Sequence, residues 1–266
     1  MFENYVPPAL FVTWQDQASR TIHPVGRLVR VMQPEPGYEF AYLEAVRAAE
    51  GIGFVPFAGF PDHNEVYWSR DLPPFFQNRL MPPARAEFTA QLAELGLKAD
   101  AGPEAILART NGRRATDPYE LFAEFEPTEA RGEWETRFFA RSMRYLSHAS
   151  DIDELMPGQR LLCMQDLQNP VDRDAIAFRT EHNAIVGFSP AYLVDELGPL
   201  LLKPDNVVVV SVERVNPPPA PLQHRLRCHL RVRPQDDFHA YRRGRYAPLS
   251  ADALRLAPWE RAAKVA

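Results

Sequence analysis

Apolar residues along this chain follow either the spacing of a strand or the spacing of a helix. The change from one spacing to the other separates the expected strands from the expected helices. Residues 10–14, 25–29 and 38–42 are short runs rich in aromatic and β-branched side chains, a composition that favours β-strands. Apolar residues at helical spacing predict a helix over 84–97, and a proline at the start of 103–109 is typical of a second, shorter helix. The first part of the chain is therefore expected to be a small α+β domain.

Strand patterns dominate the second part of the chain, with one helix among them. Residues 224–232 alternate apolar and polar side chains with a period of two, as a strand with one buried face does. Ser189 is suited to cap a helix and Pro190 to begin it, and leucines follow at helical spacing. The expected strands are residues 137–145, 160–165, 174–178, 184–188, 206–212 and 224–232. Six strands and one helix predict a small β-barrel with an inserted helix.

An acidic stretch separates these two parts. Residues 120–135 contain a proline and a glycine and lack a clear period, so we expect a short solvated junction between two domains. After the last strand, residues 234–266 are expected to form a basic tail, either as a terminal helix over 251–265 or as a loose segment. The chain is therefore divided into a first domain over 1–130, a second over 131–233 and the tail.

Composition limits what these domains can be. With 45% hydrophobic residues among 266, the chain has enough apolar side chains for a sizeable core, and no run is long and apolar enough for a membrane helix. The N-terminus lacks the features of a secretory signal, and two cysteines are too few for a disulfide framework or a cysteine-based zinc site. We therefore expect a cytoplasmic protein.

The charge of the chain requires any site for nucleic acid to be local. The formal net charge is −5, which does not fit a nonspecific coat for nucleic acid. Arginine supplies 27 of the 30 basic residues. Its fork binds phosphates and carboxylates, but a GC-rich genome would produce the same bias. The position of each arginine is therefore more informative than the total.

Sequence motifs give no support for catalysis. The chain has no GxGxxG or GxxxxGK[ST] nucleotide-binding pattern, no HExxH or CxxC metal pattern and no GxSxG nucleophile. Seven histidines are scattered without the i, i+4 spacing of a helical metal site. We therefore expect a non-catalytic protein with no metal site and no cofactor.

The most specific local feature is a polar loop between two of the expected strands. Residues 166–176 read DLQNPVDRDAI, with the turn-forming pair Asn169-Pro170 ahead of Asp172. One interpretation is structural, an Asx-capped hairpin loop whose acids pair with Arg173. A second is a fixed carboxylate that accepts a hydrogen bond from a hydroxyl, beside arginines that bind phosphate. A third is a metal-dependent nuclease that uses the three aspartates of the loop, Asp166, Asp172 and Asp174.

Several pieces of the second part follow the order and spacing of a known domain family. They are Phe138 to Tyr145, Pro157-Gly158, the Asn-Pro-x-Asp loop up to Ile176, Val186-Gly187-Phe188-x-Pro190, and a helix that ends in Leu200-Leu201. On these pieces, residues 137–232 resemble the HIRAN domain, which is found at the front of some DNA-repair translocases and alone in many bacterial proteins. The resemblance implies an OB-like barrel that binds the 3′ end of single-stranded DNA.

The resemblance also implies which residues contact the DNA. Arg144 and Tyr145 match a pair that engages the terminal nucleotide in the characterised member, and Asn169 and Asp172 match the loop that receives the free 3′-hydroxyl. Tyr145 offers a ring on which a base can stack, worth ~1–3 kcal/mol, and Arg144 offers a fork for a phosphate. A carboxylate at Asp172 would accept a hydrogen bond from a free hydroxyl and repel a phosphorylated end.

Two positions differ from that DNA-binding member. Val171 occupies an aromatic position, so one stacking surface is missing, and Phe188 replaces a polar residue. The ring of Phe188 offers a replacement surface, which makes Phe188 a fifth candidate for DNA binding. Packing inside the barrel is the alternative interpretation for both Tyr145 and Phe188.

A second set of short matches covers the first domain. Residues 12–14, 25–28, 38–42 and 75–82 occur in an order that makes residues 9–122 similar to the N-terminal subdomain of HipA, the toxin kinase of bacterial toxin–antitoxin systems. The kinase core does not follow, so the resemblance implies a partner or regulatory domain. The aromatic residues that crowd 54–76 predict the core of this domain or, where they are exposed, a surface for docking a partner.

The sequence thus predicts a bacterial, cytoplasmic α+β protein, with a HipA-N-like domain followed by an OB-like HIRAN barrel. Its expected function is to bind single-stranded DNA or DNA 3′ ends. A HipA-type kinase or a DNA-processing protein is expected as a further partner, and a membrane is not. The alternatives are a non-catalytic regulator that binds a HipA-type kinase and a metal-dependent nuclease.

Overall fold

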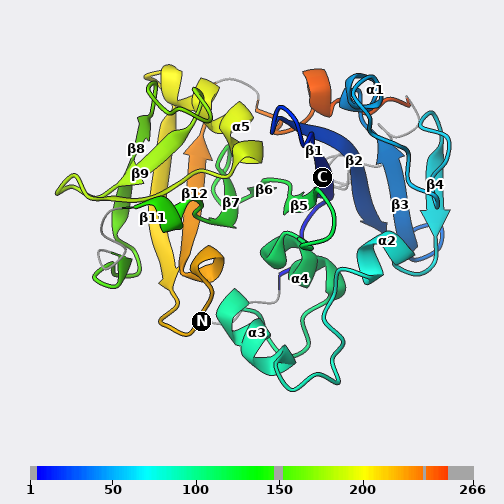
Figure 1. Cartoon of the computed structure of the whole chain (residues 1–266), viewed down its shortest axis with the longest axis horizontal. Helices are drawn as coiled ribbons and strands as arrows, with labels where there is room; N and C mark the ends of the chain where they lie inside the picture. Colours follow the sequence, from blue (N-terminus) through cyan, green and yellow to red (C-terminus); the bar gives the residue numbers. More distant parts are fainter. Residues whose placement is uncertain (1–4, 147–151, 236–237, 251–266) are drawn as a thin grey trace. The chain divides into compact units, whose positions relative to one another are not determined.

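The chain folds as two compact units. The computed structural model describes residues 5–146, 152–235 and 238–250. The first unit is Met1–Glu124 with Ala240–Ala266, and the second is Phe125–His239. The change of unit falls inside the acidic stretch 120–135. Figure 1 follows the chain through both units, coloured from blue to red.

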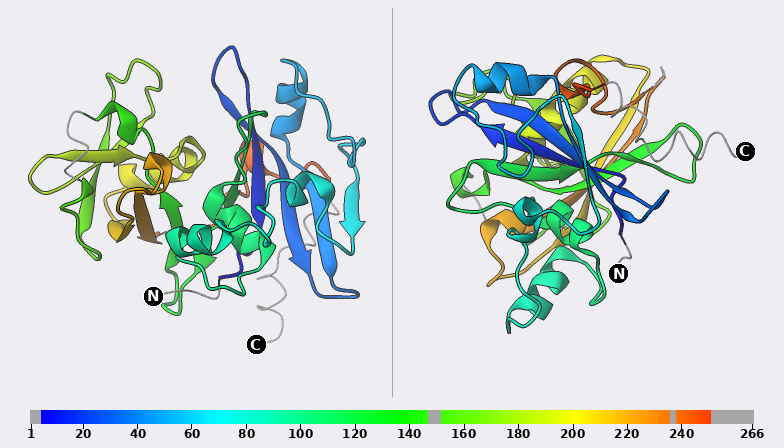
Figure 2. Two further views of the ribbon diagram at one scale, coloured as in Figure 1. Left: turned by 60° about the horizontal axis from the view of Figure 1, so that its bottom comes forward. Right: turned by 90° about the vertical axis from the view of Figure 1, so that its right-hand side faces the viewer.

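A five-stranded antiparallel sheet forms the first unit, in the order β4-β3-β2-β1-β5. Figure 2 shows its strands from two further directions. The strands are β1 Leu10–Gln15, β2 Ile22–Val31, β3 Gly37–Tyr42, β4 Val66–Ser69 and β5 Tyr119–Ala123. The first three cover the runs predicted from their aromatic and β-branched composition, with a few residues added at their ends.

Four short helices accompany this sheet. They are α1 Ala45–Glu50, α2 Pro74–Gln77, α3 Phe88–Leu95 and α4 Pro103–Thr110. The helix expected over 103–109 is thus confirmed. The one expected over 84–97 is shorter, because residues 84–87 form turns and Gly96 ends the helix in a left-handed conformation with a φ of 68°.

Aromatic rings fill the core of the first unit. Phe40 stacks on Phe60 with ring centroids 4.2 Å apart, and Phe57 and Phe76 pack around Phe40. The buried Tyr42 hydroxyl donates to the carbonyl of Phe60 and accepts from the amide of Phe57, so this polar group is satisfied inside the core. The aromatic core expected within residues 54–76 is therefore confirmed.

Residues 240–250 of the expected tail belong to the first unit. Tyr241 and Tyr246 contact the rings of Phe11 and Phe122, and both tyrosines are buried. An isolated bridge also joins Pro248 to Leu43. The terminal helix expected over residues 251–265 lies outside the described residues.

A seven-stranded sheet forms the second unit, in the order β10-β9-β8-β11-β12-β7-β6. The strands are β6 Glu126–Pro127, β7 Trp134–Phe139, β8 Arg160–Gln165, β9 Ile176–Arg179, β10 Ile185–Phe188, β11 Val207–Val215 and β12 Leu226–Arg233. The helix α5 Ala191–Leu202 lies between β10 and β11 in sequence and is drawn yellow in Figure 1. Its N-cap is Pro190, one residue after the expected Ser189.

The sheet curls but does not close into the expected barrel. The edge strand β10 meets the chain beyond β7 through an isolated bridge between Phe188 and Arg141, with N···O distances of 2.8 and 3.0 Å. Across this approach, a Cβ at Gly187 would lie 2.8 Å from the Cβ of Ala140, so a side chain does not fit there. Among the described residues no continuous ladder joins the two edges, so the expected β-barrel is not closed.

The expected junction between two units lies within residues 120–135, but it is not a solvated linker, because residues 121–125 are buried and β5, β6 and part of β7 occupy the stretch. Phe122 in β5 stacks on Phe11, and Phe125 is fully buried. Glu124 is buried as well and pairs with Arg27 at 3.1 Å. The remaining residues form the β6–β7 hairpin, whose turn is closed by a bond from the Thr128 amide to the Glu133 carbonyl. Apolar residues such as Phe122 and Phe125 lie between the acidic residues, and their burial brings the neighbouring acids into the folded structure.

One face of the second sheet forms its core. The residues that alternate on β12 toward the interior, Cys228, Leu230 and Val232, are buried, as expected from their period of two. Phe138 on β7 contacts Phe178 on β9 beneath them, with centroids 5.6 Å apart. None of the helices within the described ranges is long and apolar enough to cross a membrane.

Candidate functional site

The loop between β8 and β9 is held together by backbone and side-chain hydrogen bonds. The Asp166 amide donates to the Ala175 carbonyl at 2.8 Å and closes the loop at its base. Inside it, Asn169 Oδ1 accepts hydrogen bonds from the amides of Val171 and Asp172 at 3.0 and 3.1 Å. Asn169 Nδ2 donates to Asp166 Oδ2 at 3.1 Å. One asparagine therefore fixes both sides of the loop.

Asp172 is presented by this framework. Its Oδ1 accepts a hydrogen bond from the Asp174 amide at 3.0 Å, which fixes the carboxylate relative to the backbone. The side chain is half-buried, and within the described ranges no group donates to its Oδ2. The Asx-capped loop expected from Asn169-Pro170 is therefore confirmed. Its expected pairing with Arg173 is not found among the described residues, where Arg173 is exposed.

The tip of the loop carries apolar side chains into solvent. Leu167 is 71% exposed and Val171 is 85% exposed. The Val171 amide belongs to the Asx turn, because it donates to Asn169 Oδ1. The Val171 side chain therefore projects from backbone that this hydrogen bond holds in place. The loop therefore combines an acceptor with an apolar surface.

Arg144 and Tyr145 lie on a short 3₁₀ turn, Met143–Tyr145, two residues beyond Arg141. Ser142 precedes the turn with a φ of 62°, and buried Met143 anchors it. Tyr145 is 75% exposed, which excludes the packing interpretation for its ring. The guanidinium carbon of Arg144 lies 5.3 Å from the centre of that ring, so the two side chains form one exposed surface.

Phe188 connects these two segments through the backbone. It pairs with Ala177 on β9, the strand that the Asx-capped loop enters, and its bridge to Arg141 holds the approach to the 3₁₀ turn. Its side chain is half-buried. In the described part of the chain, however, no hydrogen bond or ion pair links Asn169 or Asp172 to Arg144 or Tyr145. The structure thus pairs the backbone of Phe188 with the strand that follows the loop and with Arg141, ahead of the 3₁₀ turn.

The aspartates of the loop do not gather around one point. Asp166 is engaged with Asn169, and Asp172 with the amide of Asp174. Over the residues that the structure describes, no three His, Cys, Asp or Glu side chains are placed to hold a metal ion.

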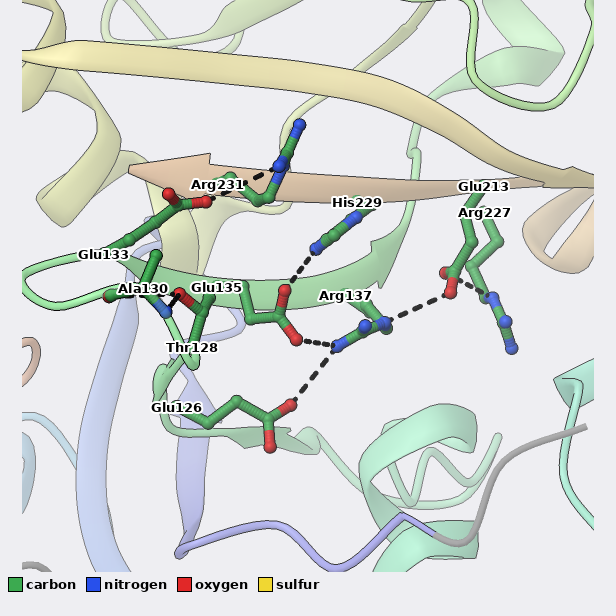
Figure 3. Close-up of polar contacts among 10 residues, drawn as sticks. All are labelled: Glu126, Thr128, Ala130, Glu133, Glu135, Arg137, Glu213, Arg227, His229 and Arg231. Atoms are coloured by element: carbon green, nitrogen blue, oxygen red, sulfur yellow. Dashed lines mark hydrogen bonds and ion pairs between the residues drawn. The ribbon is translucent and has the colours of Figure 1, made fainter. Parts of the chain in front are cut away.

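A second polar region lies on the outer face of β7, β11 and β12, as Figure 3 shows. Arg137 is its centre, and it pairs with Glu135 at 2.8 Å, Glu213 at 3.1 Å and Glu126 at 3.3 Å. Glu213 also contacts Arg227 at 2.7 Å. His229 Nε2 lies 2.8 Å from Glu135 Oε2. We call these residues the Arg137 network; they are Glu126, Glu135, Arg137, Glu213, Arg227 and His229.

Burial and charge act together on the titratable groups of the Arg137 network. Burial raises the pKa of Glu135, but the hydrogen bond and charge of Arg137 and the hydrogen bond from His229 outweigh it and hold that pKa below its usual value. Burial and the Arg137 charge lower the pKa of His229, against the opposing charges of Glu135 and Glu213. The imidazole is therefore mainly neutral at neutral pH.

A family model for the HIRAN domain matches residues 135–235. Residues 135–235 form a HIRAN domain. The match extends from β7 to the end of β12, so the HIRAN domain contains the Asx-capped loop, the 3₁₀ turn and Phe188.

Solved structures add two similar proteins. One is a Lactobacillus plantarum protein from a structural genomics consortium, 18% identical over 38% of this chain and 97% of the other, with a TM-score of 0.31. The other is the HIRAN domain of human HLTF, 15% identical over 37% of this chain and 72% of the other, with a TM-score of 0.28. No curated protein matches the chain.

The basic residues that alternate with the apolar ones along β12 are not among the candidates chosen from the sequence. Its apolar half is identified by the period of two, but Arg227, His229, Arg231 and Arg233 occupy the intervening positions on the opposite face. The period of two places these basic residues together on one face of the strand. It does not show which acidic residues of the neighbouring strands lie beside them, because the strand register decides this.

Proposed function

We propose that this protein binds single-stranded DNA at a 3′ end through its HIRAN domain, and that it does so without catalysis. Asp172 accepts the terminal hydroxyl, Tyr145 and Phe188 contact bases, and Arg144 binds a phosphate. Asn169 holds the loop in the binding conformation. The observation that carries this proposal is the half-exposed Asp172 carboxylate, fixed through Oδ1 and with no donor to Oδ2 among the described residues.

The chemistry of these groups supports a strand end. A carboxylate accepts a hydrogen bond from a hydroxyl and repels a phosphate, so it distinguishes the two kinds of terminus. A solvent-exposed tyrosine next to an arginine suits a nucleotide, because the ring stacks on a base while the guanidinium forks onto the phosphate. The exposure of Tyr145, at 75%, leaves this surface open to a ligand.

Binding of single-stranded DNA is tested with fluorescence anisotropy on the full chain. We expect Tyr145→Ala and Arg144→Ala each to weaken binding of a 12-nucleotide single strand by about tenfold, since a stacked base or a charged hydrogen bond contributes ~1–3 kcal/mol. Arg144→Ala should also reduce the salt dependence. Arg85→Ala is the matched control, because Arg85 is exposed in the first unit. Equal affinity of all four proteins would contradict the assignment of these residues.

The role of the first unit is a separate proposal. Residues 9–122 serve as a partner or scaffold domain, as their resemblance to the HipA N-terminal subdomain implies, and a HipA-type kinase is the partner to test first. Co-purification of such a kinase with the full chain would support this role. A kinase bound by a chain that has no affinity for DNA would favour the regulator over the DNA-binding function.

A further inference from the structure

The outer face of β12 carries four basic residues that fall into two pairs. Arg227 and His229 belong to the Arg137 network, and the Arg227 side chain is only 3% exposed. Arg231 and Arg233 differ, because their side chains are 50% and 57% exposed. On this face of β12, the first pair is therefore engaged by the network, and the second pair, toward the end of the strand, is accessible to a ligand.

Arg231 and Arg233 share a single carboxylate among the described residues. Glu133 lies 3.6 Å from Arg231 and 3.0 Å from Arg233, and Figure 3 shows the first of these contacts at the edge of the Arg137 network. Two guanidinium groups on one carboxylate leave one net positive charge. The Glu133 side chain is only 13% exposed, whereas both arginine side chains are half-exposed, so each guanidinium keeps donors in solvent that can bind an anion beside Glu133.

A shallow hollow lies beside these arginines. Its volume is about 190 Å³, and it is lined by Glu133, Val207, Val209, Arg231, Val232 and Arg233. This is below the ~300 Å³ at which small-molecule pockets begin, so the hollow is not an enclosed ligand site. Val207 is 51% exposed. An open apolar floor with two guanidinium forks at its rim suits a sugar and its phosphate.

The hollow lies at the same end of the sheet as the Asx-capped loop. β8 and β11 are antiparallel, and so are β11 and β12. The end of β8, which leads into that loop, is therefore on the same side as the start of β11 at Val207 and the end of β12 at Arg233. β8 pairs with β11 at Arg160 and Leu161, near the start of β8, and there two strand spacings, roughly 10 Å, separate β8 from β12. OB-fold proteins bind ~4–16 nucleotides of a single strand, and a strand of that length is long enough to contact both places.

We propose that Arg231 and Arg233 form a second phosphate-binding position for single-stranded DNA, which holds nucleotides upstream of the 3′ end. The proposal rests on the proposed function, because it assigns the continuation of the strand whose terminus is bound at Asp172. The phosphate binds the exposed donors of the two guanidinium groups beside Glu133, and Val207 contacts the sugar.

The test compares oligothymidylates of 3 and 12 nucleotides, binding to the full chain by anisotropy and by competition. We expect R231Q/R233Q to weaken binding of the 12-mer by about tenfold and to leave the 3-mer unchanged. The slope of log affinity against log salt should fall by about 0.7 for the 12-mer, since loss of one phosphate contact on a single strand removes about 0.7. Arg85→Gln is the exposed control.

A second variant is expected to strengthen binding, so misfolding cannot produce the expected result. Glu133→Gln removes the competing carboxylate and should strengthen binding of the 12-mer several-fold. Unchanged 12-mer affinity and salt slope in both variants would overturn this inference while the proposed function stands. Failure of the wild-type protein to bind either oligonucleotide would overturn both. Tighter binding of poly-glutamate than of the 12-mer, lost in R231Q/R233Q, would assign the site to an acidic peptide and also overturn the inference.

Discussion

Two polar regions of the HIRAN domain use their carboxylates in opposite ways. In the Asx-capped loop, Asp172 is bound by a backbone amide and stays half-exposed. In the Arg137 network, Glu135 and Glu213 are bound by arginine and histidine side chains, and their side chains are 18% and 17% exposed. Whether a carboxylate is available to a ligand therefore depends on the group that already binds it.

This difference has an energetic counterpart. Charges that are mostly removed from water depend on each other, so loss of one leaves the others unpaired at a cost of several kcal/mol. A carboxylate capped by an amide in a surface loop loses only a local hydrogen bond, worth about 1 kcal/mol. The Arg137 network should thus control stability, and the Asx-capped loop should control binding.

The largest expected effect comes from Arg137→Met. Removal of the guanidinium leaves Glu126, Glu135 and Glu213 without their shared partner, so we expect the free energy of unfolding to fall by roughly 3–5 kcal/mol. Urea denaturation followed by circular dichroism measures this change. Arg173→Met, in the exposed part of the loop, is the control and should change stability by less than ~0.5 kcal/mol. Similar losses in both variants would remove the distinction between the two regions.

Asn169→Ala should act on both properties, with a smaller effect on stability. The variant loses the hydrogen bonds to the amides of Val171 and Asp172, which we expect to cost about 1–2 kcal/mol. Since Asp172 is then no longer held, affinity for single-stranded DNA should fall as well. Unfolding and anisotropy measurements on the same preparation check this pair of effects. A stability loss with unchanged affinity would show that loop order does not matter for binding.

Val171→Tyr should improve binding. The exposed Val171 side chain stands on rigid backbone, so a ring placed there gains a stacked base without a large loss of order. We expect about a fivefold increase in affinity, or ~1 kcal/mol, at the lower end of the range for base stacking. Leu167→Tyr places the same ring on the neighbouring exposed position and serves as the control. An equal gain at both positions would indicate nonspecific adhesion.

The smallest effect is a change in pH dependence at His229. Its pKa is held below the usual value of 6.5, so below that pH the unfolded chain binds a proton that the folded chain resists. Stability should therefore fall as the pH drops below about 6.5. His229→Gln keeps a donor for Glu135 and should flatten this fall, whereas the exposed His182→Gln should not. Urea denaturation at pH 7.5, 6.5 and 5.5 resolves the difference. Identical profiles for the two variants would contradict a lowered pKa at His229.

The sequence predicts those elements whose signals are local. The strand at β12 follows from its period of two, and the capped loop follows from Asn169-Pro170, because both depend on neighbours within a few residues. The burial of residues 121–125 could not be predicted, because it depends on partners far away in the sequence. Phe122 is covered by Phe11 and Glu124 is neutralised by Arg27, and these partners lie about a hundred residues away in the sequence.

The candidate site follows the same division. Arg144, Tyr145, Asn169, Asp172 and Phe188 could be chosen from the sequence through the HIRAN resemblance, which a family model supports for residues 135–235. Their arrangement could not be chosen, because the bridge from Phe188 to Arg141 depends on how far the sheet curls. The accessible pair Arg231 and Arg233 likewise becomes visible only when the register shows which basic residues Glu213 and Glu135 already occupy.

The central claim is that Asp172 selects a free 3′-hydroxyl, and one comparison tests it directly. Anisotropy measures the affinity of the full chain and of Asp172→Asn for two single strands that differ only in a 3′-hydroxyl or a 3′-phosphate. We predict that the wild-type protein prefers the hydroxyl by about tenfold or more, and that Asp172→Asn loses most of this preference because an amide does not repel phosphate. Equal affinity of the wild-type protein for both ends would contradict the account.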